Sequence, residues 1–164
     1  MSHDLSLVHK KTRKEYKIKS FPNNTFLTTQ HGGTIRLGVQ DNEPVEVRFN
    51  FTYNYYNILK DIFHSDEGIK CLYNIPIDKV IVNIGVAVAV LMQRIREQGI
   101  TPKKFKCYCH CRKKMINEKD VDYWTASYMN VFYALMHMYN LLLCAITDMY
   151  LTKKNPEDYI LDGD

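Results

Sequence analysis

Ten residues at positions 48–57, RFNFTYNYYN, combine the side-chain types from which a polar and aromatic binding site is built. Amide groups can donate and accept hydrogen bonds, tyrosine rings can stack on a flat group, and an arginine can neutralise a negative charge. The stretch alternates like a strand as far as Thr52 and then takes up helical spacing, which predicts a strand-to-helix junction. Free N–H groups at the start of a helix favour anions. The candidate ligand-binding residues in this corner are Arg48, Asn50, Thr52, Tyr53, Asn54 and Tyr56.

A structural role accounts for the same corner without any ligand. In this alternative Asn54 or Thr52 caps the following helix, Thr52 fills one face of the sheet, and the tyrosines pack with their hydroxyl groups toward solvent. Residue types and spacing leave both interpretations open.

A second candidate for chemistry is the run CYCHCRKK at positions 107–114. Its four potential soft metal ligands are Cys107, Cys109, His110 and Cys111. Structural zinc sites use pairs of ligands about two to four residues apart with a second pair elsewhere, and that second pair is missing here. In an extended chain the cysteines would share one face with Phe105, which predicts a half-buried strand over 105–111 that holds no metal. Metal binding and redox chemistry are the alternatives, and the opposite, basic face, which includes Arg112, could meet an anion.

The sequence carries none of the short motifs that mark common catalytic sites. It has no glycine-rich phosphate loop, no HExxH and no GxSxG. Its acidic residues are scattered and indicate no pair of catalytic carboxylates, and His137, in an apolar run, is expected in the core. We therefore assign no catalytic residue, metal or cofactor and expect binding without turnover. An enzyme acting on a nucleotide substrate remains an alternative, because active sites assemble in space from distant residues.

The elements that must position these residues follow from the spacing of apolar side chains. Apolar residues alternate with polar ones on both sides of a polar turn, which predicts an antiparallel hairpin over about 34–52. Apolar residues three and four positions apart predict a short helix at about 54–64 and two long helices at about 76–98 and 120–150. Together these elements predict an α+β fold in which a small antiparallel sheet packs on two long helices.

The helix predicted at 120–150 carries more apolar surface than a single helix face can hold. Such a helix needs more than one partner, so it lies between the sheet and another helix or forms the seam of a homo-oligomer. The spacing of its residues does not separate these two alternatives.

Both ends of the chain are polar. Residues 1–19 hold several lysines and an arginine and predict a basic, solvated arm, with a strand in EYKIKSF as an additional possibility. An arm that binds phosphate is the alternative. The tail at 152–164 is predicted to be loose. Three apolar residues near its end could dock instead, namely Tyr159, Ile160 and Leu161. We expect a single domain that spans residues 1–164.

Composition limits the class of protein. The chain has 164 residues and a formal net charge of +4, a mild bias that favours anionic partners without requiring nucleic acid. Its 12 tyrosines against one tryptophan suit a binding surface, because tyrosine joins apolar area to a hydroxyl group. The five cysteines suggest no secreted disulfide framework, no signal segment is visible, and the most apolar runs are shorter than a bilayer span. We therefore expect a cytoplasmic protein whose partner is neither a membrane nor a specific nucleic-acid sequence.

The order of these elements and two short motifs resemble a family of small, uncharacterised bacterial and phage proteins. In that family a strand ends in an Asn-x-Thr-His-Asn motif, and a Trp-Gly pair opens the last helix. Asn50, Thr52 and Asn54 match the first motif, whereas Tyr53 stands in place of its His. Trp124 matches the Trp of the second motif.

The resemblance covers about residues 33–150 and implies a ligand site rather than a particular reaction. Thr125 stands where the family has Gly, and the missing His at position 53 argues against any chemistry that depends on it. The resemblance also implies a phage or mobile-element origin, which would place the protein in the cytoplasm of a host.

These observations combine into one functional hypothesis, the non-catalytic binding of a small anionic ligand such as a signalling nucleotide. The side chains that would contact it are Asn50 and Asn54 for polar contacts, Tyr53, Tyr56 and Trp124 for stacking, and Arg48 and Arg112 for phosphate. The most specific form is a phage sponge that sequesters an immune signal. The alternatives are a protein-interaction module that acts as a homo-oligomer through the helix at 120–150, or an enzyme on a nucleotide substrate.

Overall fold

The computed structural model describes residues 2–21, 34–35, 45–52, 55–114 and 122–163. At positions 2, 34, 35, 45, 52 and 110–114 it describes the backbone alone. The elements found in this part of the chain form an α+β fold, as predicted.

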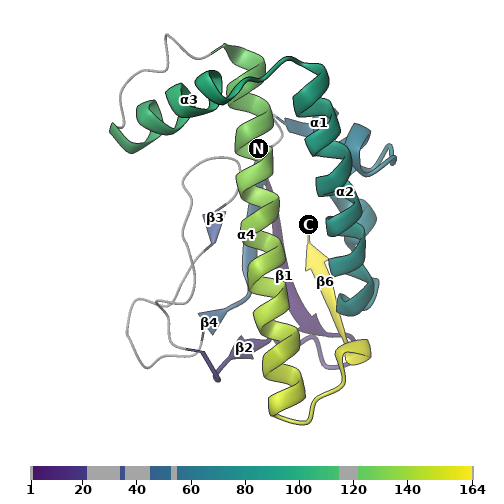
Figure 1. Ribbon diagram of the computed structural model, residues 1–164. Helices are drawn as coiled ribbons and strands as arrows, with labels where there is room; N and C mark the ends of the chain where they lie inside the picture. Colours follow the sequence, from purple (N-terminus) through teal and green to yellow (C-terminus); the bar gives the residue numbers. More distant parts are fainter. Residues whose placement is uncertain (1, 22–33, 36–44, 53–54, 115–121, 164) are drawn as a thin grey trace.

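A four-stranded antiparallel sheet forms one layer of the protein (Figure 1). Its strands are β1 (Ser2–His9), β3 (Thr34–Ile35), β5 (Arg48–Thr52) and β6 (Tyr159–Gly163), in the order β3-β5-β1-β6. β1 pairs with β5 on one side and with β6 on the other, so the first and last strands of the chain lie side by side. A separate two-stranded ladder joins β2 (Lys17–Ile18) to β4 (Val45–Glu46).

The helices agree with the predicted short and long helices and add further elements. They are α1 (Tyr56–Ile62), η3 (Gly68–Leu72), α2 (Ile77–Glu97), α3 (Pro102–Lys114), α4 (Tyr123–Leu151) and η4 (Pro156–Asp158). Pro76 is the N-cap of α2, and Gly99, with a φ of 66°, follows its end. Proline is favoured near the start of a helix and glycine just after its end.

The inner face of the sheet is apolar and packs against the helices. Val47, Phe49 and Phe51 are buried, whereas Arg48 and Asn50 between them are partly exposed. This alternation confirms the period-two pattern of the predicted hairpin. α4 runs along the sheet with α2 beside it (Figure 1). Full burial of each large apolar side chain in such a layer contributes about 1.5–3 kcal/mol.

The wide apolar surface of α4 is covered from several sides. This helix contacts α1, α2 and α3 as well as β2 and β3. Leu135, Met138 and Leu142 are fully buried among these elements. By length and composition alone α4 could cross a membrane, but a buried core helix passes the same test, and 50% of its most apolar window is buried within the fold.

Strands β1 and β6 correct the predicted arm and tail. Residues 2–9 of the segment expected to be a basic arm at 1–19 form β1, in which Leu5 and Leu7 are buried. Residues 159–163 of the tail expected to be loose at 152–164 form β6, so its apolar residues dock instead. In β1 the polar residues Asp4 and Ser6 alternate with the buried Leu5 and Leu7, whereas Tyr159, Ile160 and Leu161 of β6 are all buried.

The strand predicted over 105–111 is wrong, because these residues belong to α3. Tyr108 is fully buried, and its hydroxyl donates a hydrogen bond to Oδ1 of Asn130 on α4. Phe105 and Lys106 are exposed. One buried tyrosine therefore docks a helix whose other described residues remain largely in solvent. Alternating cysteines in a short segment do not distinguish this arrangement from a strand.

The hairpin predicted at 34–52 is confirmed in its pairing and revised in its extent. β3 pairs antiparallel with β5, whereas β4 pairs with β2 instead. The predicted turn, QDNEP at 40–44, lies outside the described residues. The helix expected at 54–64 is α1, and its N-cap is Tyr55 rather than Thr52 or Asn54.

Gly163 in β6 provides a test of how tightly the terminal strands pack. A Cβ atom at this position would lie 2.6 Å from Oη of Tyr73 and 2.8 Å from the backbone oxygen of Asp4. Because the Asp4 oxygen belongs to the paired strand and cannot easily move aside, Gly163→Ala is expected to lower the free energy of unfolding by about 1–3 kcal/mol. Urea denaturation measures this change.

Gly85→Ala is the matched control for that variant. A Cβ atom at Gly85, within α2, would meet no described atom within 4 Å. Helix propensity should therefore make Gly85→Ala more stable by about 0.5–1 kcal/mol. If Gly163→Ala were as stable as the wild type, the close packing of β6 on Tyr73 and β1 would be contradicted.

Candidate functional site

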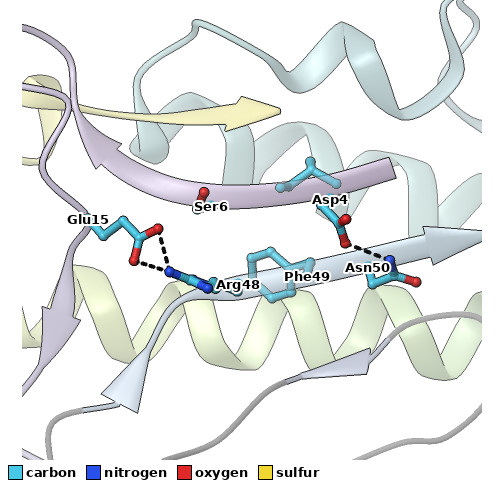
Figure 2. A pocket seen from close by; sticks show the side chains of 7 residues that line it. Asp4, Ser6, Glu15, Arg48, Phe49 and Asn50 are labelled. Atoms are coloured by element: carbon cyan, nitrogen blue, oxygen red, sulfur yellow. Dashed lines mark hydrogen bonds and ion pairs between the residues drawn. The ribbon is translucent and has the colours of Figure 1, made fainter. Parts of the chain in front are cut away.

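Arg48 and Asn50 line a hollow on the outer face of the sheet, where β1 and β5 pair (Figure 2). Alternation along β5 places both side chains on the face away from the apolar core. The hollow has a volume of about 220 Å³. Its polar lining residues are Asp4, Ser6, Glu15, Arg48 and Asn50.

The charged groups of this hollow already have partners. Nη2 of Arg48 lies 2.6 and 2.5 Å from the two carboxylate oxygens of Glu15 (Figure 2). Nε of Arg48 lies 3.3 Å from a carboxylate oxygen of Glu46. The hydrogen bond to Glu15 is the main cause that raises the pKa of Arg48. Asn50 donates a 2.6 Å hydrogen bond from Nδ2 to Asp4. An anion at this hollow would have to displace Glu15 from Arg48.

Tyr56 lines a different and larger cleft, which has a volume of about 570 Å³. The residues that line it are His3, Tyr56, Asp66, Glu67, Lys70, Tyr73 and Asn74. They come from β1, α1, η3 and the turns that flank η3. His3 pairs with Phe51 in the β1–β5 ladder, so the cleft lies beside the end of β5, where the predicted corner begins.

The ring of Tyr56 is held in place by three contacts. Its hydroxyl donates a 2.7 Å hydrogen bond to the backbone oxygen of Asp66. The ammonium of Lys60 lies 5.1 Å from the ring centroid, within the range of a cation–π contact. Gly68, with a φ of 59°, packs so closely that a Cβ atom there would lie 3.3 Å from the ring. Because 36% of Tyr56 is still exposed, the ring is fixed but remains accessible for stacking.

Tyr73 and Asn74 are fixed at the cleft by the neighbouring strand β6. The backbone N–H of Asn74 donates a 3.1 Å hydrogen bond to Leu161, and Tyr73 forms a parallel bridge with the same residue. Asn74 has a φ of 62°, a left-handed conformation that asparagine adopts more readily than most residues. The position of Asn74 in the cleft depends on the docking of β6, which is distant in sequence.

The cleft offers stacking, hydrogen bonding and mixed charge. Tyr56 and Tyr73 provide rings, and Asn74 provides an amide. The same cleft carries a histidine, two carboxylates and a lysine, namely His3, Asp66, Glu67 and Lys70. Such a lining can hold a small polar molecule that contains a flat group. The carboxylates of the cleft can accept hydrogen bonds, and Lys70 can form an ion pair with an anion.

The site residues predicted from the sequence do not all line one cavity. Arg48 and Asn50 share the hollow, Tyr56 lines the cleft, and Trp124 is not among the described lining residues of either. Trp124 is 51% exposed in the first turn of α4, where its ring contacts Tyr123 and Tyr128. Thr52 and Arg112 are placed by their backbone alone, and Tyr53 and Asn54 lie outside the described residues.

Thr125, which follows Trp124, has a structural role at the start of α4. Its backbone N–H and its hydroxyl each donate a 2.8 Å hydrogen bond to the carboxylate of Asp122, the N-cap. This arrangement satisfies one of the free N–H groups at the start of the helix. Thr125 therefore stabilises the first turn of α4.

The cysteine run shows no metal centre in the part of the chain that the structure describes. There, no group of three or more His, Cys, Asp or Glu side chains is placed to hold a metal ion. Cys107 and Cys109 are partly buried in α3, and Sγ of Cys109 lies 3.7 Å from the hydroxyl of Tyr133. The side chains of His110 and Cys111 are not described.

Comparison with known proteins gives no relative from which a function could be transferred. No family model matches the chain, and no curated protein or solved structure matches it. The resemblance to the bacterial and phage family therefore stays a prediction, and the function has to be inferred from the cavities of this chain itself.

Proposed function

We propose that this protein binds a small anionic, nucleotide-type ligand without turnover, and that the cleft at Tyr56 receives it. The observation that carries this proposal is the convergence of two tyrosine rings, an amide and a lysine on one cavity of about 570 Å³. A cavity of that size is in the range of small-molecule sites, which run from about 300 to 1,000 Å³.

The chemistry of the cleft matches the parts of a nucleotide. A base stacks on aromatic rings, and its polar edge pairs with groups such as the amide of Asn74 and the carboxylates of Asp66 and Glu67. Lys70 at the cleft supplies positive charge for a phosphate, whereas Lys60 beside the Tyr56 ring already lies 3.7 Å from the carboxylate of Asp66. Arg48, which the sequence suggests for this task, is instead held by Glu15 and Glu46.

The specific form of this proposal is a cytoplasmic protein of phage origin that sequesters a signalling nucleotide. Such a protein needs affinity and no catalytic groups, in agreement with the lack of catalytic motifs in the sequence. A ligand recovered unchanged after long incubation supports sequestration, whereas steady loss of the ligand indicates an enzyme.

Calorimetry with nucleotides selected from a thermal-shift panel tests the site. Tyr56→Ala is expected to weaken binding by roughly 1–3 kcal/mol, because it removes a stacking ring. Tyr150→Ala is the matched control, since Tyr150 is 71% exposed on α4 and does not line the cleft. Lys70→Ala should weaken the binding of phosphate-bearing ligands more than the binding of the nucleoside. Lys79 is an exposed lysine of α2, and Lys79→Ala should change the affinity of neither ligand.

Arg48→Ala distinguishes the cleft from the hollow. We expect it to leave the affinity of the nucleotide unchanged, because Arg48 does not line the cleft. Weakened binding in Arg48→Ala together with unchanged binding in Tyr56→Ala would show that the ligand binds at the hollow instead of the cleft. No binding of any nucleotide in the panel would reject the proposed function.

A second candidate function is self-association through α4. Met136, Leu143 and Tyr150 are exposed apolar side chains spaced seven residues apart, so they lie on one stripe of this helix. Such a stripe is typical of helices that pack against a second copy. The molecular mass of wild type and of Leu143→Glu, measured by light scattering, decides whether this stripe is a seam.

A further inference from the structure

An apolar groove lies where the end of α2, the start of α3 and the first half of α4 meet. It has a volume of about 320 Å³. Its apolar lining residues are Met92, Ile95, Ile100, Phe105, Met129 and Phe132. Met92 is 57% exposed and Phe105 is 37% exposed, so the groove is open to solvent in this chain. Methionines line it from both long helices, and their unbranched side chains adapt to differently shaped partners.

The helix beside this groove is strongly basic. Six of the thirteen residues of α3 are lysine or arginine and none is acidic. Lys103 and Lys106 are exposed next to Phe105, and Arg96 is exposed in the last turn of α2. None of these three takes part in an ion pair among the described residues.

The carboxylates near the groove, by contrast, already have cationic partners. Glu97 lies 3.2 Å from Arg94, which also pairs with Asp61 at 2.8 Å. Asp122 lies 3.4 Å from Lys104. Among the described residues, the charge left without an ion pair beside the groove is therefore positive, and the groove itself is apolar.

Buried hydrogen bonds fix the position of α3 before any partner binds. The hydroxyl of Tyr108 donates to Asn130 on α4, and Nδ2 of Asn130 donates a 2.8 Å hydrogen bond to the hydroxyl of Tyr55. The rings of Tyr108 and Tyr133 stack with centroids 6.2 Å apart. A groove that is already formed costs less conformational entropy when a partner enters it.

We propose that this groove binds an acidic amphipathic helix of a partner protein, and that α3 supplies the positive charge that selects it. Apolar side chains on one face of the partner helix would fill the groove, as in other helix-in-groove complexes. Acidic side chains on its flanks would meet Lys103, Lys106 and Arg96. A nucleic acid would use the basic helix but leave the apolar groove empty, so the two features together favour the peptide.

Fluorescence anisotropy with a designed peptide tests this assignment. The probe is a labelled peptide of about five helical turns, with leucine on one face and glutamate elsewhere. The comparison peptide has the same leucines with lysine in place of glutamate. We expect saturable binding of the acidic peptide, at least about tenfold weaker binding of the basic peptide, and weakening by added salt.

Two pairs of exposed variants separate the groove from the rest of the surface. Met92→Glu places a charge in the groove and is expected to weaken binding of the acidic peptide at least about tenfold. Val86→Glu is its control, because Val86 is also 57% exposed on α2 but does not line the groove. Lys103→Glu should also weaken binding of the acidic peptide. Lys79→Glu makes the same charge change at an exposed position near the start of α2 and should leave peptide binding unchanged.

Each remaining outcome counts against the inference. Equal binding of the acidic and basic peptides would show that the positive charge of α3 does not select an acidic partner helix. Equal effects of Met92→Glu and Val86→Glu would place the peptide outside the groove. Absence of peptide binding would overturn the proposal, and binding of duplex DNA or anionic vesicles that survives Met92→Glu would then identify α3 as a polyanion-binding helix instead.

Discussion

Leu142→Glu is expected to abolish the folded state. Leu142 is 0% exposed on α4, in the core between the sheet and the other helices. A glutamate there would bury a carboxylate without a partner, which costs several kcal/mol even after its pKa rises to neutralise it. That cost, added to the lost apolar contacts, is comparable to the roughly 5–15 kcal/mol that stabilises a typical domain. Loss of the cooperative transition in thermal circular dichroism is the expected result.

The adjacent residue provides the matched control. Leu143 is 45% exposed, so Leu143→Glu keeps its carboxylate in water and should unfold within a few degrees of the wild type. If the stripe of Leu143 is an oligomer seam, this variant is a folded monomer while the wild type is larger. A cooperative unfolding transition in Leu142→Glu close to that of Leu143→Glu would contradict the position of α4 in the core.

Asp148→Ala is the second substitution with a large expected effect. Asp148 is 1% exposed near the end of α4. Its Oδ1 accepts hydrogen bonds from the backbone N–H groups of Ser20 at 2.8 Å and Lys19 at 3.2 Å, and its Oδ2 accepts one from the hydroxyl of Tyr16. Since a hydrogen bond to a charged group contributes about 1.5–3 kcal/mol, we expect a loss of about 3–5 kcal/mol in urea denaturation.

Tyr16→Phe separates the contributions within this cluster. It removes one donor and leaves the two backbone donors on Asp148, so it should cost about 1.5–3 kcal/mol, less than Asp148→Ala. If the two side chains act through their mutual hydrogen bond, the double variant costs less than the sum of the single variants. If the stability losses of the two single variants added up to that of the double variant, the hydrogen bond between Tyr16 and Asp148 would not contribute to docking the segment before β2 on α4.

The same cluster predicts how stability depends on pH. Burial by itself would raise the pKa of Asp148, but hydrogen bonds from Ser20, Tyr16 and Lys19 outweigh it and hold the pKa below its ordinary value. A carboxyl group with a lowered folded-state pKa contributes stability that is present above its unfolded pKa, about 3.9, and is lost as the pH falls through the folded pKa.

Asp148→Asn makes this pH dependence measurable. The stability advantage of the wild type over Asp148→Asn should be constant above about pH 5 and shrink below about pH 4, because only the wild type gains a proton at residue 148. A constant difference down to pH 2 would mean that the carboxyl group does not titrate with a lowered pKa in the folded protein.

The cysteine-rich segment illustrates where local spacing gives the wrong answer. Cys107 and Cys109 alternate with Tyr108 in the way that strand residues do, yet the segment is α3. Among the described side chains of α3, Tyr108 alone is fully buried, through contacts with α4 that are distant in sequence. A segment that docks through one residue carries no apolar periodicity from which its conformation could be predicted.

The candidate site shows a different limit. Arg48, Asn50 and Tyr56 lie close together in sequence, but two of them line the hollow on the sheet and the third lines the cleft. The other groups that decide the character of each cavity come from elsewhere in the chain. Glu15 neutralises Arg48, and Tyr73 joins Tyr56 only because β6 docks beside it. No local pattern around residue 50 contains that information.

The sequence by itself determined the α+β class, the buried face at Val47, Phe49 and Phe51, and the courses of α1, α2 and α4. These features follow from burying one face of a strand or helix, which leaves a period of about 2 or 3.6 residues in the sequence. The tertiary structure alone decided that β1 and β6 pair and which polar groups share a cavity. Those features depend on contacts such as Val8 with Ile160, between residues at opposite ends of the chain, and such contacts leave no local periodicity in the sequence.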